Sequence, residues 1–261
     1  MGIAVVGVLS AGVGAGNVVS AAVALVQVFL VQLHSFSMNN YYDARYWKEN
    51  NYIQELLEHG TPRWKIYFYG HIPLLLAALF LPVSGIFTLL LLGYAALFYV
   101  YQGPPRLKMH WASSLVLNAI PLGLIIYLHP YLVTSGRLET TGIFFAVMFT
   151  FYMAFFEIAH QLQHDKIESS HSLVDVFGRE TSVKIGMIAL TIPALLGLLL
   201  YFVATLPASI SAVAVGFTAL RLYTLIDIGT DPDAVQTIRG SWHKFYSAFE
   251  GAIYVILLAV M

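Results

Sequence analysis

The feature that most constrains this chain is a series of apolar runs, each close to the length of a membrane-spanning helix. Hydrophobic residues make up 59% of the 261 positions and charged residues only 10%, whereas a soluble domain usually carries about a quarter charged residues. An α-helix needs roughly 20 apolar residues to cross the hydrocarbon core of a bilayer. The sequence therefore predicts an all-α, polytopic membrane protein.

Polar residues, proline and glycine divide the chain into about nine such runs. We expect membrane-spanning helices over residues 2–15, 17–38, 64–81, 84–101, 112–129, 139–161, 183–204, 207–227 and 243–261. The first run is short for a bilayer. Sustained alternation of apolar and polar residues is absent from the sequence, which argues against a transmembrane β-barrel.

The basic residues fall on one side of these predicted helices. Of the 13 Lys and Arg residues, all except Arg137 lie in or beside connections that emerge on the same face. Because cytoplasmic loops carry the excess of Lys and Arg, this face is predicted to be cytoplasmic. The net charge of −1 argues against nucleic-acid binding. The lack of cysteine excludes disulfides, thiolate metal sites and a cysteine nucleophile.

Two polar clusters are predicted to emerge on this cytoplasmic face. Asn39 and Asp43 follow the second run, and Glu157, Gln161 and Asp165 lie at the end of the sixth. Residues four apart stack along one face of a helix. Because four spans separate the clusters, both reach the same side of the membrane. Their carboxylate and amide oxygens suit Mg²⁺, which commonly binds one or two carboxylates together with substrate phosphates.

Each cluster also has a simpler interpretation, as a set of polar caps at the membrane interface. Glu157 favours a site, because an ionisable group one turn inside an apolar helix costs about 2.5–3.5 kcal/mol on insertion scales. The segment YVYQGPPRLKMHW adds Arg106 and Lys108 on the same face, after a Pro-Pro pair that stops the preceding helix. The two cations suit a metal-bound diphosphate, and anchoring to anionic lipid head groups is an equally ordinary role.

Together these three elements resemble the UbiA superfamily of intramembrane prenyltransferases. That family carries an N-D-x-x-D-x-x-x-D motif after its second helix, a Y-x-x-P-P-x-R-L-K loop, and D-x-x-x-D after its sixth helix. The matching residues here are Asn39, Asp43, Tyr101, Pro104, Pro105, Arg106, Leu107, Lys108 and Asp165, and a further family stretch is matched by Leu173, Gly178, Arg179 and Glu180. The form NNYYD looks closest to the menaquinone-type branch, which places Glu49 at that branch's last acid.

The chain also departs from the family pattern. Asn40 and Gln161 stand at aspartate positions, Trp47 stands at the third acid of the commoner first motif, and the Pro-Pro loop is one residue shorter than usual. An amide keeps an oxygen ligand but removes a negative charge. We therefore expect weaker Mg²⁺ binding, or binding that depends more on the phosphates of the substrate. Candidate compensating residues are Glu49, Glu157, His160 and His164.

The resemblance implies one domain over residues 1–261, with its helices around a central cavity that opens to the cytoplasmic side and to the bilayer. It implies a Mg²⁺-dependent prenyltransferase that ionises a polyprenyl diphosphate to an allylic cation and alkylates a hydrophobic acceptor, of the aromatic, quinone-precursor type. The catalytic residues would be Asp43, Asp165 and Lys108; the substrate-binding residues would be Asn39, Asn40, Tyr101, Arg106, Lys108, Gln161, His164 and Lys166; and Mg²⁺ would be held by Asn39, Asp43, Gln161 and Asp165, with Glu49 and Glu157 as further candidate ligands.

Other functions fit the same sequence. Within the superfamily, a terpene cyclase and a lipid or carotenoid prenyltransferase are alternatives. A membrane subunit that has lost catalysis would also explain the altered acids. A small transporter is less favoured, because few ionisable residues beyond Glu157 and Glu250 lie near the middle of the predicted spans, where transporters commonly bind their substrates.

Overall fold

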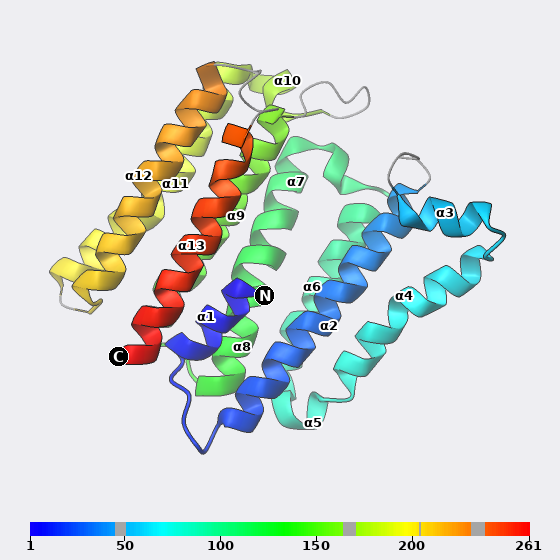
Figure 1. The fold of residues 1–261 in the computed structure, drawn as a ribbon, viewed down its shortest axis with the longest axis horizontal. Helices are drawn as coiled ribbons and strands as arrows, with labels where there is room; N and C mark the ends of the chain where they lie inside the picture. Colours follow the sequence, from blue (N-terminus) through cyan, green and yellow to red (C-terminus); the bar gives the residue numbers. More distant parts are fainter. Residues whose placement is uncertain (45–50, 164–170, 204, 231–237) are drawn as a thin grey trace.

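The computed structural model of the protein is a helical bundle, and it describes residues 1–44, 51–163, 171–203, 205–230 and 238–261, with the side chains of 163, 228 and 238–244 excluded. The described residues form helices and one isolated bridge between two loops. The main helices are α1 (Gly2–Ser10), α2 (Val18–Asp43), α4 (Arg63–Ala78), α6 (Thr88–Gln102), α7 (Trp111–Asn118), α8 (Ile126–Ser135), α9 (Thr140–Gln163), α11 (Arg179–Phe202), α12 (Ala208–Thr230) and α13 (Ile238–Val260). The prediction of an all-α membrane protein is confirmed (Figure 1).

Each of the nine predicted runs contains a helix, but the count of nine membrane spans is not confirmed. Among the described residues, six helical segments are long and apolar enough to cross a bilayer: Val18–Asp43, Leu81–Gln102, Trp111–Ser135, Thr140–Leu162, Arg179–Phe202 and Ala208–Asp227. The first run forms only the nine residues of α1, α4 has 16 residues, and the described apolar part of the last helix is Phe245–Val260.

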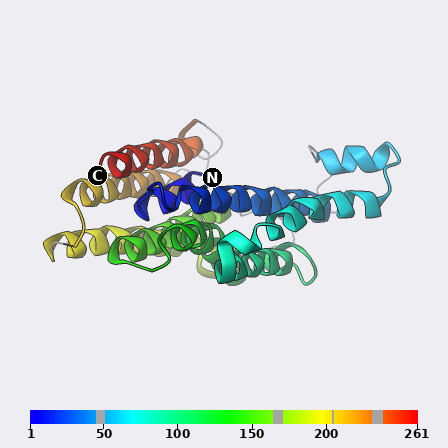
Figure 2. The same cartoon turned by 90° about the horizontal axis from the view of Figure 1, so that it is seen from below.

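Short elements connect these helices, most of them at the ends of the bundle. They are α3 (Tyr52–Glu58), α5 (Leu81–Ser84), the 3₁₀ turns η1 (Gly85–Phe87) and η2 (Leu107–Met109), the π-helix η3 (Ala119–Ile125) and α10 (Leu173–Phe177). The π-helix η3 lies between α7 and α8 within the segment Trp111–Ser135. Viewed from below, α3 and α4 lie at one edge of the bundle, and α11 and α12 lie at the other (Figure 2).

The largest apolar core surrounds α9, where helix packing excludes both lipid and water. Phe144, Phe145, Met148 and Phe155 of α9 are fully buried and belong to one cluster with residues of α8, α11, α12 and α13. A second core, which includes Val28, joins α2 to α4, α6 and α8. Among the described residues these are the two larger of three apolar clusters, and α8 contributes to both.

The π-helix η3 sets how closely the α7–α8 segment approaches α9. Pro121 lies inside η3 and lacks the N–H that a regular helix would use there. A Cβ atom at Gly123 would come within 2.5 Å of the Phe149 carbonyl oxygen and 2.6 Å of Thr150 Cα, so only glycine allows this backbone contact. Small residues permit such close helix packing in membranes. The contact places the α7 side chains beside α9, which matters for the polar site described below.

A buried ion pair joins α12 to α13. Arg221 Nη2 donates a hydrogen bond to Glu250 Oε2 at 2.5 Å, and both side chains are almost fully buried. The Arg221 guanidinium lies 4.0 Å from the ring centroid of Tyr152 on α9, whose hydroxyl donates to Glu250 at 3.2 Å. Because each charge would be costly in an apolar bundle without its partner, the pair fixes the position of α13 against α9 and α12.

Removing one member of this pair should therefore destabilise the protein more than removing both. We expect Glu250→Ala to lower the free energy of unfolding by about 3–5 kcal/mol, because it leaves the Arg221 charge buried. The double variant Arg221→Met with Glu250→Leu should lose less. SDS titration in mixed micelles measures both changes.

The matched control is Glu139→Ala, which removes the exposed ion pair between Glu139 and Arg137 in the connection from α8 to α9. This variant should change stability by at most about 1 kcal/mol. If Glu250→Ala were as mild as this control, the buried pair would not hold α13 in place.

Candidate functional site

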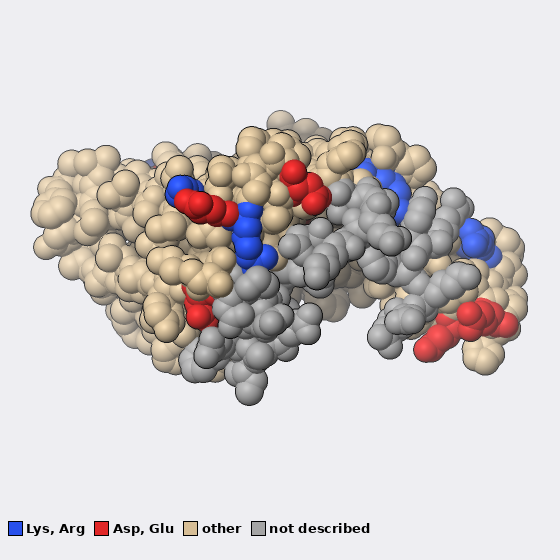
Figure 3. All heavy atoms as spheres, turned by 90° about the horizontal axis from the view of Figure 1, so that it is seen from above, with Lys and Arg blue, Asp and Glu red and all other residues tan. Residues whose placement is uncertain are grey.

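Charged side chains gather at one end of the bundle, the end at which α2 and α9 finish. Figure 3 shows this end, where Lys and Arg lie close to Asp and Glu. Among the described residues, Arg137 and Glu139 lie at the opposite end, where α8 is followed by α9, and Arg221 and Glu250 lie inside the bundle. The predicted gathering of basic connections at one end is therefore present in the described structure.

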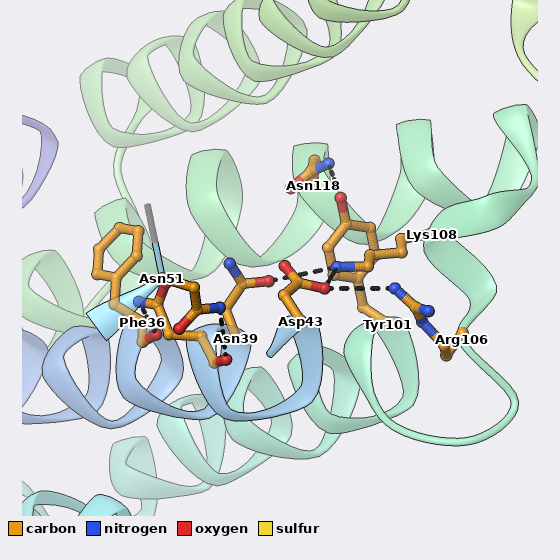
Figure 4. A network of polar contacts seen from close by, with 9 residues as sticks. Phe36, Asn39, Asp43, Asn51, Tyr101, Arg106, Lys108 and Asn118 are labelled. Atoms are coloured by element: carbon orange, nitrogen blue, oxygen red, sulfur yellow. Dashed lines mark hydrogen bonds and ion pairs between the residues drawn. The ribbon is translucent and has the colours of Figure 1, made fainter. Parts of the chain in front are cut away.

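The last turns of α2 bring an amide and a carboxylate to two cations (Figure 4). Asp43 Oδ1 accepts a short hydrogen bond from Lys108 Nζ and lies 3.3 Å from Arg106 Nη2. Lys108 Nζ also lies 3.5 Å from Asn39 Oδ1, one turn earlier in α2. The helix extends to Asp43, five residues beyond the predicted span, so helical spacing itself aligns Asn39 with Asp43. We call Asn39, Asp43, Arg106 and Lys108 the ion-pair cluster.

A tight turn after α6 places the two cations. The Pro104–Pro105 peptide is cis, and Arg106 has a left-handed backbone with φ 58° and ψ 57°. A left-handed conformation costs a residue other than glycine about 1–2 kcal/mol. The Arg106 N–H donates to the Gly103 carbonyl at 2.5 Å, which closes the turn. The chain thus reverses direction within a few residues and directs Arg106 and Lys108 back to the end of α2.

Glu157 accepts hydrogen bonds from three side chains. Ser114 Oγ donates to its Oε1 at 2.5 Å, Gln161 Nε2 donates to Oε1 at 2.9 Å, and Asn118 Nδ2 donates to Oε2 at 2.6 Å. Asn118 also donates to the Tyr101 hydroxyl at 3.0 Å. The carboxylate therefore joins α9 to α7 and, through Asn118, to α6, just below the ion-pair cluster.

Gln161 and the chain that returns to α10 connect α9 to the Pro-Pro loop. Gln161 Oε1 accepts from the Leu173 N–H at 2.8 Å, so both ends of this amide are already hydrogen-bonded. The His171 N–H donates to the Met109 carbonyl at 3.0 Å, and the Trp111 N–H donates to the His171 carbonyl at 2.9 Å. These contacts hold the start of α10 against the segment that follows Lys108.

Arg179 holds the ends of two helices together. Its Nη1 donates to the Leu162 carbonyl and its Nε donates to the Gly229 carbonyl, each at 3.3 Å. Both carbonyls belong to the last turn of a helix, where unpaired acceptors and the helix dipole favour a cation. Arg179, which the family stretch around Gly178 and Glu180 singled out, thus fixes the end of α9 from which the second polar cluster emerges.

The structure brings part of the predicted site together. Asn39, Asp43, Tyr101, Arg106 and Lys108 lie at the same end of the bundle as Glu157 and Gln161, and polar contacts connect them as two neighbouring groups. Asn40 is not in the ion-pair cluster, because its amide donates to the Phe36 carbonyl at 2.9 Å. The predicted residues Glu49, His164, Asp165 and Lys166, together with Trp47, lie outside the described residues.

Two residues of this end of the bundle were missed by the sequence reasoning. Ser114 and Asn118 lie within the apolar run 112–129 and donate to Glu157. Their spacing of four residues is the same as that between Glu157 and Gln161 and indicates one polar helix face. This spacing was a usable signal, but it does not show which neighbouring helix the face meets.

The described residues fit a Mg²⁺ ion that is shared with a phosphate group. They supply one carboxylate, Asp43, and one amide oxygen, Asn39, on the same helix face; the described residues form no group of three or more His, Cys, Asp or Glu side chains able to hold a metal alone. Mg²⁺ keeps several waters and is often bound by one or two carboxylates plus substrate phosphates. This ligand set therefore favours binding together with a diphosphate.

Comparisons with known proteins match this chain to one family and to solved structures of similar fold. The sequence matches the UbiA prenyltransferase family over residues 1–247. The fold is similar to a UbiA homologue from Archaeoglobus fulgidus bound to GPP and Mg²⁺, with a TM-score of 0.71, 19% identity, and coverage of 99% of this chain and 97% of that chain. It is also similar to a solved structure concerned with digeranylgeranylglyceryl phosphate synthase in membranes, with a TM-score of 0.75, 13% identity, and coverage of 99% and 94%. A comparison with curated protein sequences found no match.

The hydrogen bonds of Glu157 predict a graded response to substitution. Glu157→Ala removes the acceptor of three donors and should destabilise the protein by about 1–3 kcal/mol for each donor left without a partner. Glu157→Gln keeps one acceptor oxygen and should lose less. Unfolding in SDS mixed micelles gives both values. A Glu157→Ala variant as stable as the wild type would show that the carboxylate does not hold these helices together.

Proposed function

This chain belongs to the UbiA prenyltransferase family, and we propose that it transfers a polyprenyl group from its diphosphate to a hydrophobic acceptor within the membrane. The observation that carries the proposal is the ion-pair cluster. Two cations, a carboxylate and an amide oxygen from separate segments meet at one end of an apolar bundle. A lipid-soluble substrate with a charged head needs this combination, with polar groups for the diphosphate and apolar helices for the chain.

In the proposed reaction, the bond between the allylic carbon and the diphosphate oxygen breaks, and its electron pair stays on the diphosphate. The charge that develops on the leaving group is stabilised by Arg106 and Lys108, which act as preorganised cations in a site of low dielectric constant. Asp43 and Asn39 would hold Mg²⁺, which when bound supplies further neutralisation of the diphosphate. The acceptor then forms a bond to the allylic cation and releases a proton.

Glu157 has a supporting role in this proposal. Its three hydrogen bonds position Asn118, which donates to the Tyr101 hydroxyl, and Gln161, which accepts from the start of α10. The carboxylate would have to give up these bonds to bind a metal directly. We therefore assign Glu157 to the positioning of Tyr101 and Gln161 rather than to the first coordination shell of Mg²⁺.

The acceptor and the orientation rest on sequence patterns. The NNYYD stretch favours an aromatic, quinone-precursor-like acceptor, and the excess of Lys and Arg at the site end favours the cytoplasmic side. The fold is similar to that of a UbiA homologue at 19% identity and to that of the structure concerned with digeranylgeranylglyceryl phosphate synthase at 13% identity. These two similarities do not separate an aromatic acceptor from a lipid phosphate. A product assay with both acceptor classes makes that distinction.

The direct test is release of pyrophosphate by purified protein with Mg²⁺, geranylgeranyl diphosphate and either a hydroxylated aromatic acid or a glycerol-phosphate lipid. We expect release with the aromatic acid, and at least about a 100-fold loss in Asp43→Ala, because this variant removes a ligand of the Mg²⁺ that would stabilise the leaving diphosphate, and loss of such stabilisation commonly costs 10²–10³ in rate. Mass spectrometry of the product identifies the acceptor.

The matched control is Glu55→Gln, which removes an exposed carboxylate on α3 at the same end of the molecule. This variant should retain wild-type activity. Unchanged pyrophosphate release in Asp43→Ala would eliminate the proposed site. Failure of the wild-type protein with every donor and acceptor would instead support a subunit that has lost catalysis.

A further inference from the structure

The charged side chains of the ion-pair cluster already contact one another in the empty site. Lys108 Nζ contacts both oxygen-bearing side chains that α2 presents to the site, Asn39 and Asp43, and Arg106 contacts the same Asp43 oxygen. The proposed metal ligands are therefore paired with the proposed diphosphate-binding cations. All three charged side chains are largely removed from solvent, with 14–16% of their surface exposed.

The balance of charge in this cluster is unfavourable for a metal ion that binds alone. Among the described residues, one carboxylate and two cations give this cluster a net charge of +1. The sequence adds no second acid from α2, because Asn40 stands at an acidic position of the family motif and its side chain is bonded to its own helix. A divalent cation that approached Asp43 would have to displace Lys108 and would leave both positive charges beside it.

A diphosphate that binds alone meets the opposite difficulty. It would draw Lys108 and Arg106 away and leave the Asp43 carboxylate unpaired beside an anion. In the empty site the Lys108 ammonium and the Asp43 carboxylate form a largely buried ion pair. Breaking a buried ion pair without replacing it is strongly destabilising.

We propose that Lys108 is an internal counter-ion that occupies Asn39 and Asp43 in the empty site and transfers to the diphosphate when metal and diphosphate bind together. This inference rests on the proposed function. The two ligands restore every charge pair at once: the metal replaces Lys108 on Asp43 and Asn39, and the released ammonium pairs with a phosphate oxygen. Metal and diphosphate must therefore increase each other's affinity, and by the same factor.

The alternative is that the pair between Lys108 and Asp43 is a permanent structural anchor between α2 and the Pro-Pro loop. The two cases differ in the sign of one measurement. If Lys108 competes with the metal, its removal strengthens metal binding to the empty site. If Lys108 only anchors the loop, its removal disorders the ligands and weakens metal binding.

The experiment measures Mn²⁺ binding by electron paramagnetic resonance to the full-length protein in detergent, with and without geranyl thiolodiphosphate, a donor analogue that resists ionisation. In the wild type, the analogue should raise Mn²⁺ affinity by about 5–150-fold, the usual range of coupling between two sites. In Lys108→Met, Mn²⁺ should bind more tightly than in the wild type without the analogue, and the effect of the analogue should fall towards onefold.

Two further variants keep the result interpretable. Lys108→Arg retains the cation and should retain the coupling, while Asp43→Asn should lose Mn²⁺ binding under both conditions. If Lys108→Met unfolds in the detergent, Lys108→Gln also removes the cation and gives the same comparison of Mn²⁺ affinity with the wild type. Independent binding of Mn²⁺ and the analogue, or weaker Mn²⁺ binding in folded Lys108→Met, would overturn the inference.

Failure of this inference is distinguishable from failure of the proposed function. Mn²⁺ binding is measured without turnover, whereas the proposed function is tested by pyrophosphate release. A protein that releases pyrophosphate but binds Mn²⁺ and the analogue independently is a prenyltransferase without the counter-ion exchange.

Discussion

The constraint on which the rest of this structure depends is the cost of a polar group inside an apolar bundle, which a partner within the protein lowers. Lipid offers no hydrogen bonds, so an unpaired polar group is costly at membrane depth. The chain meets this constraint with side-chain contacts between helices. Gln27 Nε2 donates to the Ala77 carbonyl, and Gln27 Oε1 lies 3.2 Å from His129 Nε2. Arg221 pairs with Glu250, and the Glu157 carboxylate accepts from three donors. Each group therefore fixes two or more helices relative to one another.

The same constraint explains how the candidate site is positioned. Close packing at Gly123 brings α7 against α9, so Ser114 and Asn118 reach Glu157. Asn118 then extends these contacts to Tyr101 of α6, next to the turn that carries Arg106 and Lys108. The ion-pair cluster thus lies above a network whose own stability requires the helices to be in this arrangement. Packing inside the bundle therefore determines where the charged side chains at its end lie.

The departures from the family motifs lower the negative charge of the site. Replacing acids by Asn40 and Gln161 leaves Asp43 as the described carboxylate beside two cations. Both ends of Gln161 and all three contacts of Glu157 are used to join helices and loops. The described part of the site, with its single carboxylate beside two cations, is suited to a metal ion that arrives with an anionic substrate. This agrees with the choice of a diphosphate as the proposed donor.

The sequence by itself determined the all-α membrane fold, the approximate helix positions and the end of the bundle at which Asp43, Arg106, Lys108 and Gln161 lie, because hydrophobicity and helical spacing are local properties of the chain. It did not determine that Lys108 pairs with Asp43, that Glu157 is held by Ser114 and Asn118, or that α1 spans only nine residues. These features depend on which helix faces meet and how closely, and that is decided by tertiary packing at positions such as Gly123. Local spacing predicts a polar face, but only the folded bundle determines its partner.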